Sequence, residues 1–197
     1  MRARPPLRLF WWTGQANFGD RLSPLIVAHA SGRRVVLAGP EEAELVALGS
    51  ILRPLAKAWR EPRGHRPIVW GAGCMKPVGR RFTAHVDFAA VRGPKTAAAL
   101  HLALDCYGDP GILIDEVLGE SVKIGEEVAV VPHFSHVDLP VWRDLAGRPG
   151  LRFVDVRVAD PLDAVRQIAG CRHVFSSSLH GLVTADAFGI PSTWVDP

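Results

Sequence analysis

Short apolar runs alternate with stretches of helical periodicity along the chain. Each run is too short for a helix and is flanked by polar or glycine-containing segments, which is typical of strands buried on both faces of a sheet. These runs predict strands at residues 7–12, 34–37, 45–48, 67–70, 88–92, 128–132, 152–156, 173–176 and 192–195. Helices are predicted between them at residues 22–30, 50–59, 94–104, 139–146, 161–169 and 179–188. Strands separated by single helices form parallel sheets, so the pattern predicts an α/β protein.

A polar segment with two glycines, Gly119–Glu127, interrupts this alternation. We place a domain boundary there and predict two Rossmann-like parallel-sheet domains, at residues 1–121 and 122–197. Hydrophobic residues make up 48% of the 197 residues. That proportion is typical of a folded chain with a substantial core.

Composition narrows the classes of partner and the compartment. The formal net charge of +3 is a mild basic excess that favours anionic small molecules or an anionic membrane surface. No dense Lys/Arg run is interleaved with aromatic residues, so we expect no nucleic-acid partner. The cysteines (Cys74, Cys106 and Cys171) form no C-x-x-C pair, which predicts reduced thiols and neither disulfides nor a zinc site. No apolar run approaches the roughly 18–20 residues that span a bilayer, and the one after Met1 is too short for a signal peptide, so we expect a cytoplasmic protein.

Ligands of parallel sheets bind at the carboxyl ends of strands, so the loops that follow strands are the candidates for chemistry. The first is Asn17-Phe18-Gly19-Asp20, where Gly19 lets the backbone approach a ligand and Asp20 caps the helix or orients a sugar hydroxyl. An ordinary helix cap is the alternative interpretation. The loop has no G-x-G-x-x-G fingerprint, so a dinucleotide is not indicated.

Two further loops could hold an anion. Gly71-Ala72-Gly73 follows a predicted strand, and its small residues permit either close packing or approach to a phosphate. In the next loop, Arg92 and Lys95 flank the start of the helix that begins at Pro94. A helix N-terminus attracts anions, and arginine binds phosphate or carboxylate in a bidentate manner. A solvated pair of cations is the alternative there.

The strongest candidate loop runs from Ser176 to Gly181. Ser176, Ser177 and Ser178 precede His180 between an apolar strand and a helix. Serine hydroxyls and helix N–H groups can bind phosphate together, and a histidine near a helix N-terminus is biased toward its neutral form, which can accept a proton. A serine cap and a backbone-bonded histidine are the alternative. His133 follows another predicted strand and is a second-rank candidate for substrate contact, whereas no metal-ligand constellation is visible.

These loops, in this order, resemble the polysaccharide pyruvyl transferase family, and within it the exopolysaccharide (succinoglycan-type) members. The matching pieces cover nearly the whole chain: Asn17-Phe18-Gly19-Asp20, Gly71-Ala72-Gly73, Val91-Arg92-Gly93-Pro94, Gly108-Asp109-Pro110 and Ser176-Ser177-Ser178-Leu179-His180-Gly181. The last piece continues into Ala185-Asp186-Ala187-Phe188-Gly189-Ile190-Pro191. Their ordered set carries the resemblance, because each motif alone is short.

The resemblance implies a GT-B-like fold with the site in a cleft between two Rossmann-like halves. It implies transfer of pyruvate from phosphoenolpyruvate, the donor substrate, onto two hydroxyls of a sugar as a cyclic ketal, with no further cofactor. The acceptor is typically an oligosaccharide on a lipid pyrophosphate carrier, which implies peripheral contact with the inner membrane face. Members of the family are usually longer, so we expect the second domain to be shortened.

By the same resemblance, Arg92 is expected to hold the anionic groups of the donor and His180 to act as acid and base. Substrate contacts are expected from Asn17, Gly19, Asp20, Gly71, Gly73, Lys95, His133, Ser176, Ser177, Ser178 and Gly181. Many members carry arginine directly before the Leu-His pair, where this chain has Ser178, so Lys95 or another arginine would supply that cation. A nucleotide-sugar glycosyltransferase or epimerase of GT-B type, and a non-catalytic saccharide-binding protein, are the alternatives.

Overall fold

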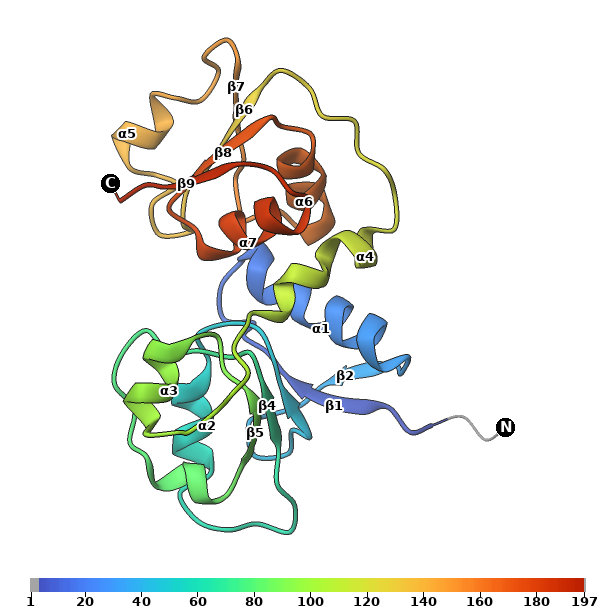
Figure 1. Cartoon of the computed structure of the whole chain (residues 1–197), viewed down its shortest axis with the longest axis vertical. Helices are drawn as coiled ribbons and strands as arrows, with labels where there is room; N and C mark the ends of the chain where they lie inside the picture. Colours follow the sequence, from blue (N-terminus) through green and yellow to red (C-terminus); the bar gives the residue numbers. More distant parts are fainter. Residues whose placement is uncertain (1–3, 197) are drawn as a thin grey trace. The chain divides into compact units, whose positions relative to one another are not determined.

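The computed structural model describes residues 4–196, which divide into two compact units (Figure 1). The first unit holds the chain up to Trp12 together with Ser23–Pro110, and the second holds Thr13–Leu22 together with the chain from Gly111 onward. We predict that the first domain ends at residue 121. The structure instead places two segments of that predicted domain, residues 13–22 and 111–121, in the second unit.

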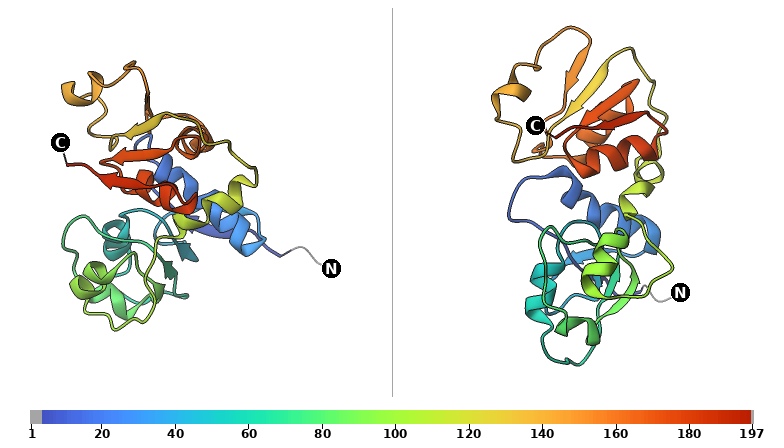
Figure 2. Two further views of the ribbon diagram at one scale, coloured as in Figure 1. Left: turned by 45° about the horizontal axis from the view of Figure 1, so that its top comes forward. Right: turned by 60° about the vertical axis from the view of Figure 1, so that its left-hand side comes forward.

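The first unit is built on a parallel sheet of five strands. Its order is β2-β1-β3-β4-β5, with β1 (Leu7–Phe10), β2 (Val35–Leu37), β3 (Leu45–Val46), β4 (Ile68–Trp70) and β5 (Asp87–Ala90). The connections contain α1 (Phe18–Ser31), α2 (Leu52–Ala58), the short 3₁₀ helix η1 (Arg81–Ala84) and α3 (Pro94–Leu100). Figure 2 shows this unit and the second one from two further directions.

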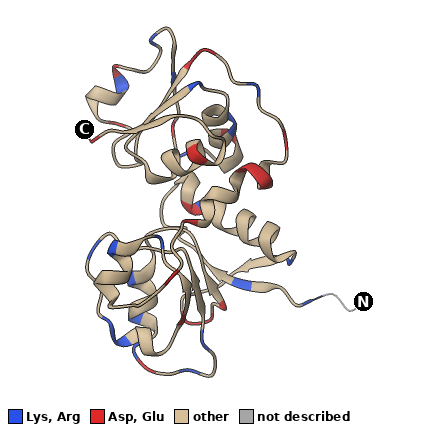
Figure 3. Ribbon diagram, in the orientation of Figure 1, with Lys and Arg blue, Asp and Glu red and all other residues tan. Residues whose placement is uncertain are grey.

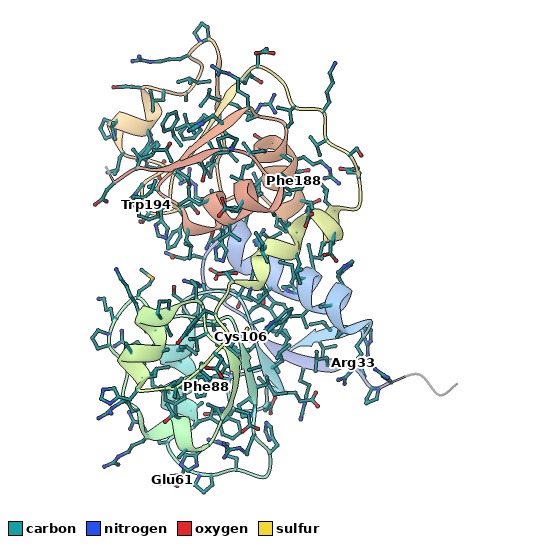
Figure 4. All side chains as sticks on the ribbon, in the orientation of Figure 1. Arg33, Glu61, Phe88, Cys106, Phe188 and Trp194 are labelled. Carbon is teal, nitrogen blue, oxygen red and sulfur yellow. The ribbon has the colours of Figure 1, made fainter. Side chains whose placement is uncertain are left out.

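One buried cluster forms the core around the middle strands of this sheet. Trp59 is fully buried directly after α2, and its indole N–H donates to the carbonyl oxygen of Pro40 at 2.6 Å. Phe82 is also fully buried, and Phe88 meets its ring edge-on with 5.9 Å between the centroids. Figure 4 labels Phe88 among the side chains of the first unit. Because a buried tryptophan needs a partner for its N–H group, the Pro40 contact fixes the loop before β3 against α2.

The second unit has a parallel sheet of four strands. Its order is β7-β6-β8-β9, with β6 (Val128–Val131), β7 (Leu151–Phe153), β8 (His173–Ser176) and β9 (Ser192–Trp194). Its connections contain the 3₁₀ helix η2 (Pro110–Leu113), α4 (Ile114–Leu118), α5 (Pro140–Arg143), α6 (Pro161–Ala169) and α7 (Leu179–Ala187). Helix α6 has a complete N-terminus: Pro161 opens it, and the Asp160 carboxylate accepts the Leu162 N–H at 2.9 Å.

Two sheets with only parallel pairings confirm the predicted α/β class. Every predicted strand is present, and the limits of β8 and α6 match the prediction. The GT-B-like arrangement stays a prediction. Among the described residues, no helix is long and apolar enough to cross a membrane.

The predicted helices differ from the structure mainly at their ends. The helix predicted at residues 94–104 ends at Leu100, because His101 takes the left-handed conformation with φ of 56°. The helix predicted at 139–146 continues only to Arg143, and α1 begins at Phe18, four residues before the predicted start at Leu22. The sequence analysis did not predict η1, η2 or α4.

Candidate active site

The strand order of the second unit defines where a ligand is expected. Chain order reverses between the neighbouring strands β6 and β8, since β7 lies outside β6 and β9 lies outside β8. In open parallel sheets, ligands bind outside the carboxyl ends of the strands at such a switch point. Pro132 and His133 follow β6 there, and Ser177 and Ser178 follow β8. The topology thus brings together two loops that are more than forty residues apart in sequence.

The buried Ser176 closes the end of β8 against β6. Its hydroxyl oxygen lies 2.8 Å from the carbonyl oxygens of both Val131 and Ser178, and it accepts the N–H of Ser178 at 2.9 Å. Gly181 makes this arrangement possible, since a Cβ there would lie 2.9 Å from Val131 Cγ1 and even closer to the Ser176 hydroxyl. These contacts give Ser176 and Gly181 a structural role in shaping the loop.

Ser177 connects two histidines at the switch point. Its hydroxyl oxygen accepts the backbone N–H of His133 at 2.9 Å and lies 3.1 Å from Nδ1 of His136. The rings of His133 and His136 are 5.4 Å apart between centroids, and Nδ1 of His133 lies 2.7 Å from the Ser135 hydroxyl. The predicted residues His133 and Ser177 therefore lie together, and His136 joins them.

Electrostatics favour the neutral form of His133. Burial lowers the pKa of His133 below its ordinary value of 6.5, and the neighbouring His136 and His180 lower it further. The cause is the cost of placing positive charges near one another in a partly desolvated site. A neutral imidazole near pH 7 can accept a proton, so His133 is a candidate proton acceptor.

His180 lies on the first turn of α7 and is 7% exposed. Gly19 packs directly against its ring: a Cβ at Gly19 would lie within 3.0 Å of the ring atoms and of His180 Cβ. Nearby in sequence, the Asn17 side-chain amide donates to the Asp20 carboxylate at 2.9 Å, and Asp20 is buried. The space beside Gly19, where the sequence analysis predicts close approach of a ligand, is thus filled by the His180 side chain.

Residues 13–22 are anchored to the second unit by backbone contacts. The N–H of Phe18 donates to the carbonyl oxygen of Val156 at 2.8 Å, and the Phe18 side chain is fully buried. Arg21 Nη1 donates to the carbonyl oxygens of Val158 and Ala159. This anchoring places Asn17, Gly19 and Asp20 in the same unit as the histidine and serine residues of the switch point.

In the first unit, Arg92 follows β5 and has a fixed side chain that is 20% exposed. Its Nε donates to the Asp109 carboxylate at 2.9 Å, and its Nη1 donates to the Ser50 hydroxyl at 3.1 Å. The Asp109 side chain is only 6% exposed. Nη2 is buried and has no hydrogen-bond partner among the described residues. A guanidinium oriented in this way retains donor capacity for a carboxylate or phosphate.

The glycines of the loop after β4 shape the surroundings of Arg92. A Cβ at Gly73 would lie 3.2 Å from the guanidinium carbon of Arg92. Gly71 has φ of +82°, and a Cβ there would lie 2.7 Å from the Gly108 carbonyl oxygen. Close packing, one of the two interpretations offered for this loop, is therefore present. Lys95 is exposed on the first turn of α3 and forms no ion pair among the described residues.

Sequence reasoning missed three contributors to these sites. Asp109 stands in Gly-Asp-Pro, whose composition is typical of a turn, and the structure pairs it with Arg92. Ser50 lies in a loop without a recognisable motif and reaches Arg92 only through the fold. For His136, the spacing of three residues from His133 was the available signal.

The chain is an α/β protein whose parallel strands end in polar loops with histidine and arginine, the position where such sheets commonly bind ligands. The chain belongs to the polysaccharide pyruvyl transferase family, whose model matches residues 13–197. This match confirms the predicted family and favours it over a nucleotide-sugar glycosyltransferase or epimerase.

Two curated relatives are similar to the chain. The succinoglycan biosynthesis protein ExoV of Rhizobium meliloti (strain 1021) is 26% identical over 192 residues, which cover 94% of this chain and 58% of that protein. An uncharacterized protein of Acanthamoeba polyphaga mimivirus is 31% identical over 202 residues, which cover 98% of this chain and 68% of that protein. The chain therefore spans 58% and 68% of the lengths of these relatives. No solved structure matches the chain significantly.

Proposed function

We propose that this chain transfers pyruvate from phosphoenolpyruvate to a saccharide of an exopolysaccharide precursor and forms a cyclic ketal. Membership of the polysaccharide pyruvyl transferase family and similarity to a succinoglycan biosynthesis protein support this class of reaction. The observation that carries the proposal is the group of three histidines around Ser177 at the switch point of the second unit. Such a group can move the protons that the reaction requires.

The reaction has a defined proton balance. Protonation of the donor methylene makes its C2 carbon electrophilic, and one sugar hydroxyl adds to that carbon. A second hydroxyl then closes the ketal as the bond between C2 and the phosphate oxygen breaks. Two hydroxyl protons are lost: one matches the proton gained by the new methyl group, and the other leaves on the phosphate. General acid–base catalysis of such transfers contributes about 100- to 10,000-fold in rate.

In this proposal His180 is the main proton carrier. Burial of its ring and packing against Gly19 restrict its orientation, which general acid–base catalysis requires. His133 lies close enough to His180 to be affected by its charge, and its lowered pKa favours the neutral state, so in this proposal it exchanges protons with His180. Ser177 and Ser178 follow β8 and supply hydroxyls for the phosphate or the acceptor, with His133, Asn17 and Asp20 as further substrate contacts.

Arg92 is assigned to the anionic groups of the donor. Asp109 and Ser50 use two of its nitrogens, so the remaining Nη2 and its neighbouring edge are oriented before any ligand arrives. Preorganised positive charge stabilises developing negative charge without reorganisation during the reaction. Lys95 adds a second, exposed cation at the start of the next helix.

The partners follow from the same proposal. The donor is phosphoenolpyruvate, no further cofactor is invoked, and the acceptor is a saccharide presented on a lipid carrier. The enzyme would then work in the cytoplasm, in peripheral contact with the inner membrane face. These assignments extend to the chain from its family and its succinoglycan-related relative.

The test is a transfer assay with phosphoenolpyruvate and an unpyruvylated exopolysaccharide oligosaccharide. The expected product gains the mass of pyruvic acid less water, and inorganic phosphate appears in equal amount. We expect His180→Ala to lose at least a hundredfold in rate. His85 lies in the first unit, outside the loops that follow β6 and β8, so His85→Ala should keep the parental rate. Full transfer by His180→Ala would remove its role. Absence of product with the parental chain would support the non-catalytic saccharide-binding alternative.

A further inference from the structure

The first unit contains a cavity of about 530 Å³ beside α2. It is lined by one face of that helix and by the loop between β4 and η1. The lining residues are Arg53, Ala56, Lys57, Arg60, Pro77, Val78, Gly79, Arg80 and Arg81. Arg92 and its partners do not line it. Pockets for small ligands commonly measure roughly 300–1,000 Å³, so the cavity has the size of a ligand site.

The spacing along α2 explains how its cations reach one cavity. Arg53 and Lys57 are four residues apart on α2, which places them on one face, and Arg60 lies two residues beyond the helix end at Ala58. The opposite face carries the buried residues Leu52 and Leu55. Because that apolar face is fixed in the core, the basic face is held outward. Arg80 is the N-cap residue of η1, which packs against α2, and this adds Arg80 and Arg81 to the same cavity.

The charges of this cavity are not balanced within the protein. Five of its lining residues are cations, and the described lining contains no carboxylate. None of the five forms an ion pair with a carboxylate of the described residues. In contrast, the nearby Arg63 and Arg66 pair with Glu41 and Asp87. Figure 3 shows the basic segments of α2 and of the loop before η1 in the first unit. Like charges gathered in this way repel one another until an anion is bound.

The polar groups present define the chemistry of the anion. Four of the five cations are arginines, whose forked N–H groups match phosphate oxygens in a bidentate manner. Arg80 already lies 2.6 Å from Nδ1 of His101, which orients one edge of its guanidinium. The described lining has no aromatic side chain, so stacking on a nucleobase is not available. Recognition would therefore depend on the phosphoryl group itself.

We propose that this cavity, named here the α2 basic pocket, binds a phosphorylated anion that carries at least two negative charges. The pocket is a second ligand site of the first unit, distinct from the group around Arg92, Asp109 and Ser50. It does not depend on pyruvyl transfer, and the same phosphoryl chemistry is offered by a soluble diphosphate or by a lipid phosphate headgroup. Bound there, the anion offsets the mutual repulsion of the five cations.

Calorimetry on the full chain with inorganic pyrophosphate tests the site. We expect the double variant Arg53→Gln/Arg80→Gln to bind at least tenfold more weakly than the parental chain, and affinity to fall as salt rises. A matched control, Arg34→Gln/Lys123→Gln, removes two exposed cations elsewhere and should keep the parental affinity. Lys57→Gln/Arg81→Gln is a second pocket variant, and chemical unfolding of every variant checks its fold. Equal affinity in all of these proteins overturns the proposal.

Two further experiments distinguish the α2 basic pocket from the Arg92 site, and a lipid headgroup from a soluble phosphorylated molecule. Arg92→Gln should keep pyrophosphate affinity within twofold, whereas loss of binding in Arg92→Gln with retention in both pocket variants overturns the proposal. Sedimentation with phosphatidylcholine vesicles, with and without phosphatidic acid, gives the second arm. Recruitment to the acidic vesicles that the pocket variants lose assigns the phosphate to a lipid headgroup. Pyrophosphate binding without recruitment assigns it to a soluble molecule.

Discussion

Gly19 and His180 lie in direct contact within the second unit, although 161 residues separate them along the chain, because Gly19 leaves the space that the imidazole ring occupies. A Cβ at Gly19 would overlap the ring and approach His180 Cβ to 2.9 Å. The glycine does not have the positive φ that favours glycine, so its requirement is one of space alone. The first candidate loop of the sequence analysis therefore contacts the histidine of the last one.

Gly19→Ala is expected to displace His180. The added methyl group cannot fit without movement of the ring or of the 17–20 segment, and overpacking of this kind costs about 1–3 kcal/mol of unfolding free energy. We expect pyruvyl transfer to fall at least tenfold because the proton carrier loses its orientation. Urea unfolding and the transfer assay measure the two effects.

Gly64→Ala is the matched control for that change, since a Cβ at Gly64 meets nothing within 4 Å. It should leave both the unfolding free energy and the rate near the parental values. If Gly19→Ala behaved like Gly64→Ala in both assays, the steric relationship with His180 would have no functional weight.

Arg92→Lys is expected to weaken binding of the donor. Lysine keeps the charge but cannot donate to Asp109 and Ser50 at once while it retains a further N–H edge. We expect the KM for phosphoenolpyruvate to rise about tenfold, which corresponds to about 1.4 kcal/mol, with a smaller change in kcat. Steady-state kinetics at varied donor concentration measure this split.

A control for Arg92→Lys is available in the same unit. Arg66 uses all three of its nitrogens, on Asp87, Ala84 and Val86, whereas Arg92 uses two. Arg66 precedes β4, so it lies at the amino ends of the strands, opposite to the carboxyl ends that carry Arg92. Arg66→Lys should therefore affect stability but leave the KM unchanged. An unchanged KM in Arg92→Lys as well would contradict the assignment of Arg92 to the donor.

Ser177→Ala is expected to loosen the histidine group. The hydroxyl accepts the His133 N–H and contacts His136, and loss of one such bond costs about 1 kcal/mol. We expect kcat to fall several-fold because the positions of the imidazoles change, and the donor KM to rise if the lost hydroxyl binds the phosphate rather than the acceptor. Ser121→Ala, an exposed serine of the connecting loop, is the control and should match the parental chain in both constants.

Stability should decrease as the pH falls below about 6.5. Burial, with His136 and His180 nearby, lowers the pKa of His133 in the folded chain, so the unfolded chain takes up the proton first. Folding stability therefore rises with pH through this range and is lost as the pH falls from 6.5 toward the lower folded value. His133→Gln should flatten this part of the profile in urea unfolding at pH 5–7, while His85→Gln should reproduce the parental slope.

The sequence predicts most of the secondary structure because the apolar runs are short, well separated and nearly free of polar residues. Val128–Val131 lies within one such run, which predicts a strand at residues 128–132. Helix ends depend on weaker local signals: nothing in the Ala-rich stretch after Pro94 indicates that His101 adopts the left-handed conformation that ends α3. Helix α4, with only five residues, is too short to show a periodic pattern.

The sequence predicts which loops carry the candidate site residues, but it does not predict which side chains contact Arg92. The histidine and serine residues after β6 and β8 are found because parallel sheets place ligands at strand ends. The pairing of Arg92 with Ser50 spans 42 residues and has no local signature. For Asp109, the turn composition of Gly-Asp-Pro gives no sign of the ion pair, because its partner Arg92 lies 17 residues earlier in the chain.

The placement of residues 13–22 has a consequence for how the protein is made. This decapeptide leaves the ribosome early, yet the carbonyl of Val156 that receives the Phe18 amide is synthesised 138 residues later. The apolar Phe18 ring therefore cannot be buried until the rest of the second unit has been synthesised, although helix α1 can form earlier. A fragment that begins at Gly111 would therefore lack residues 13–22, which form part of the core of the second unit. Addition of a peptide that spans residues 13–22 should restore the fold of this fragment.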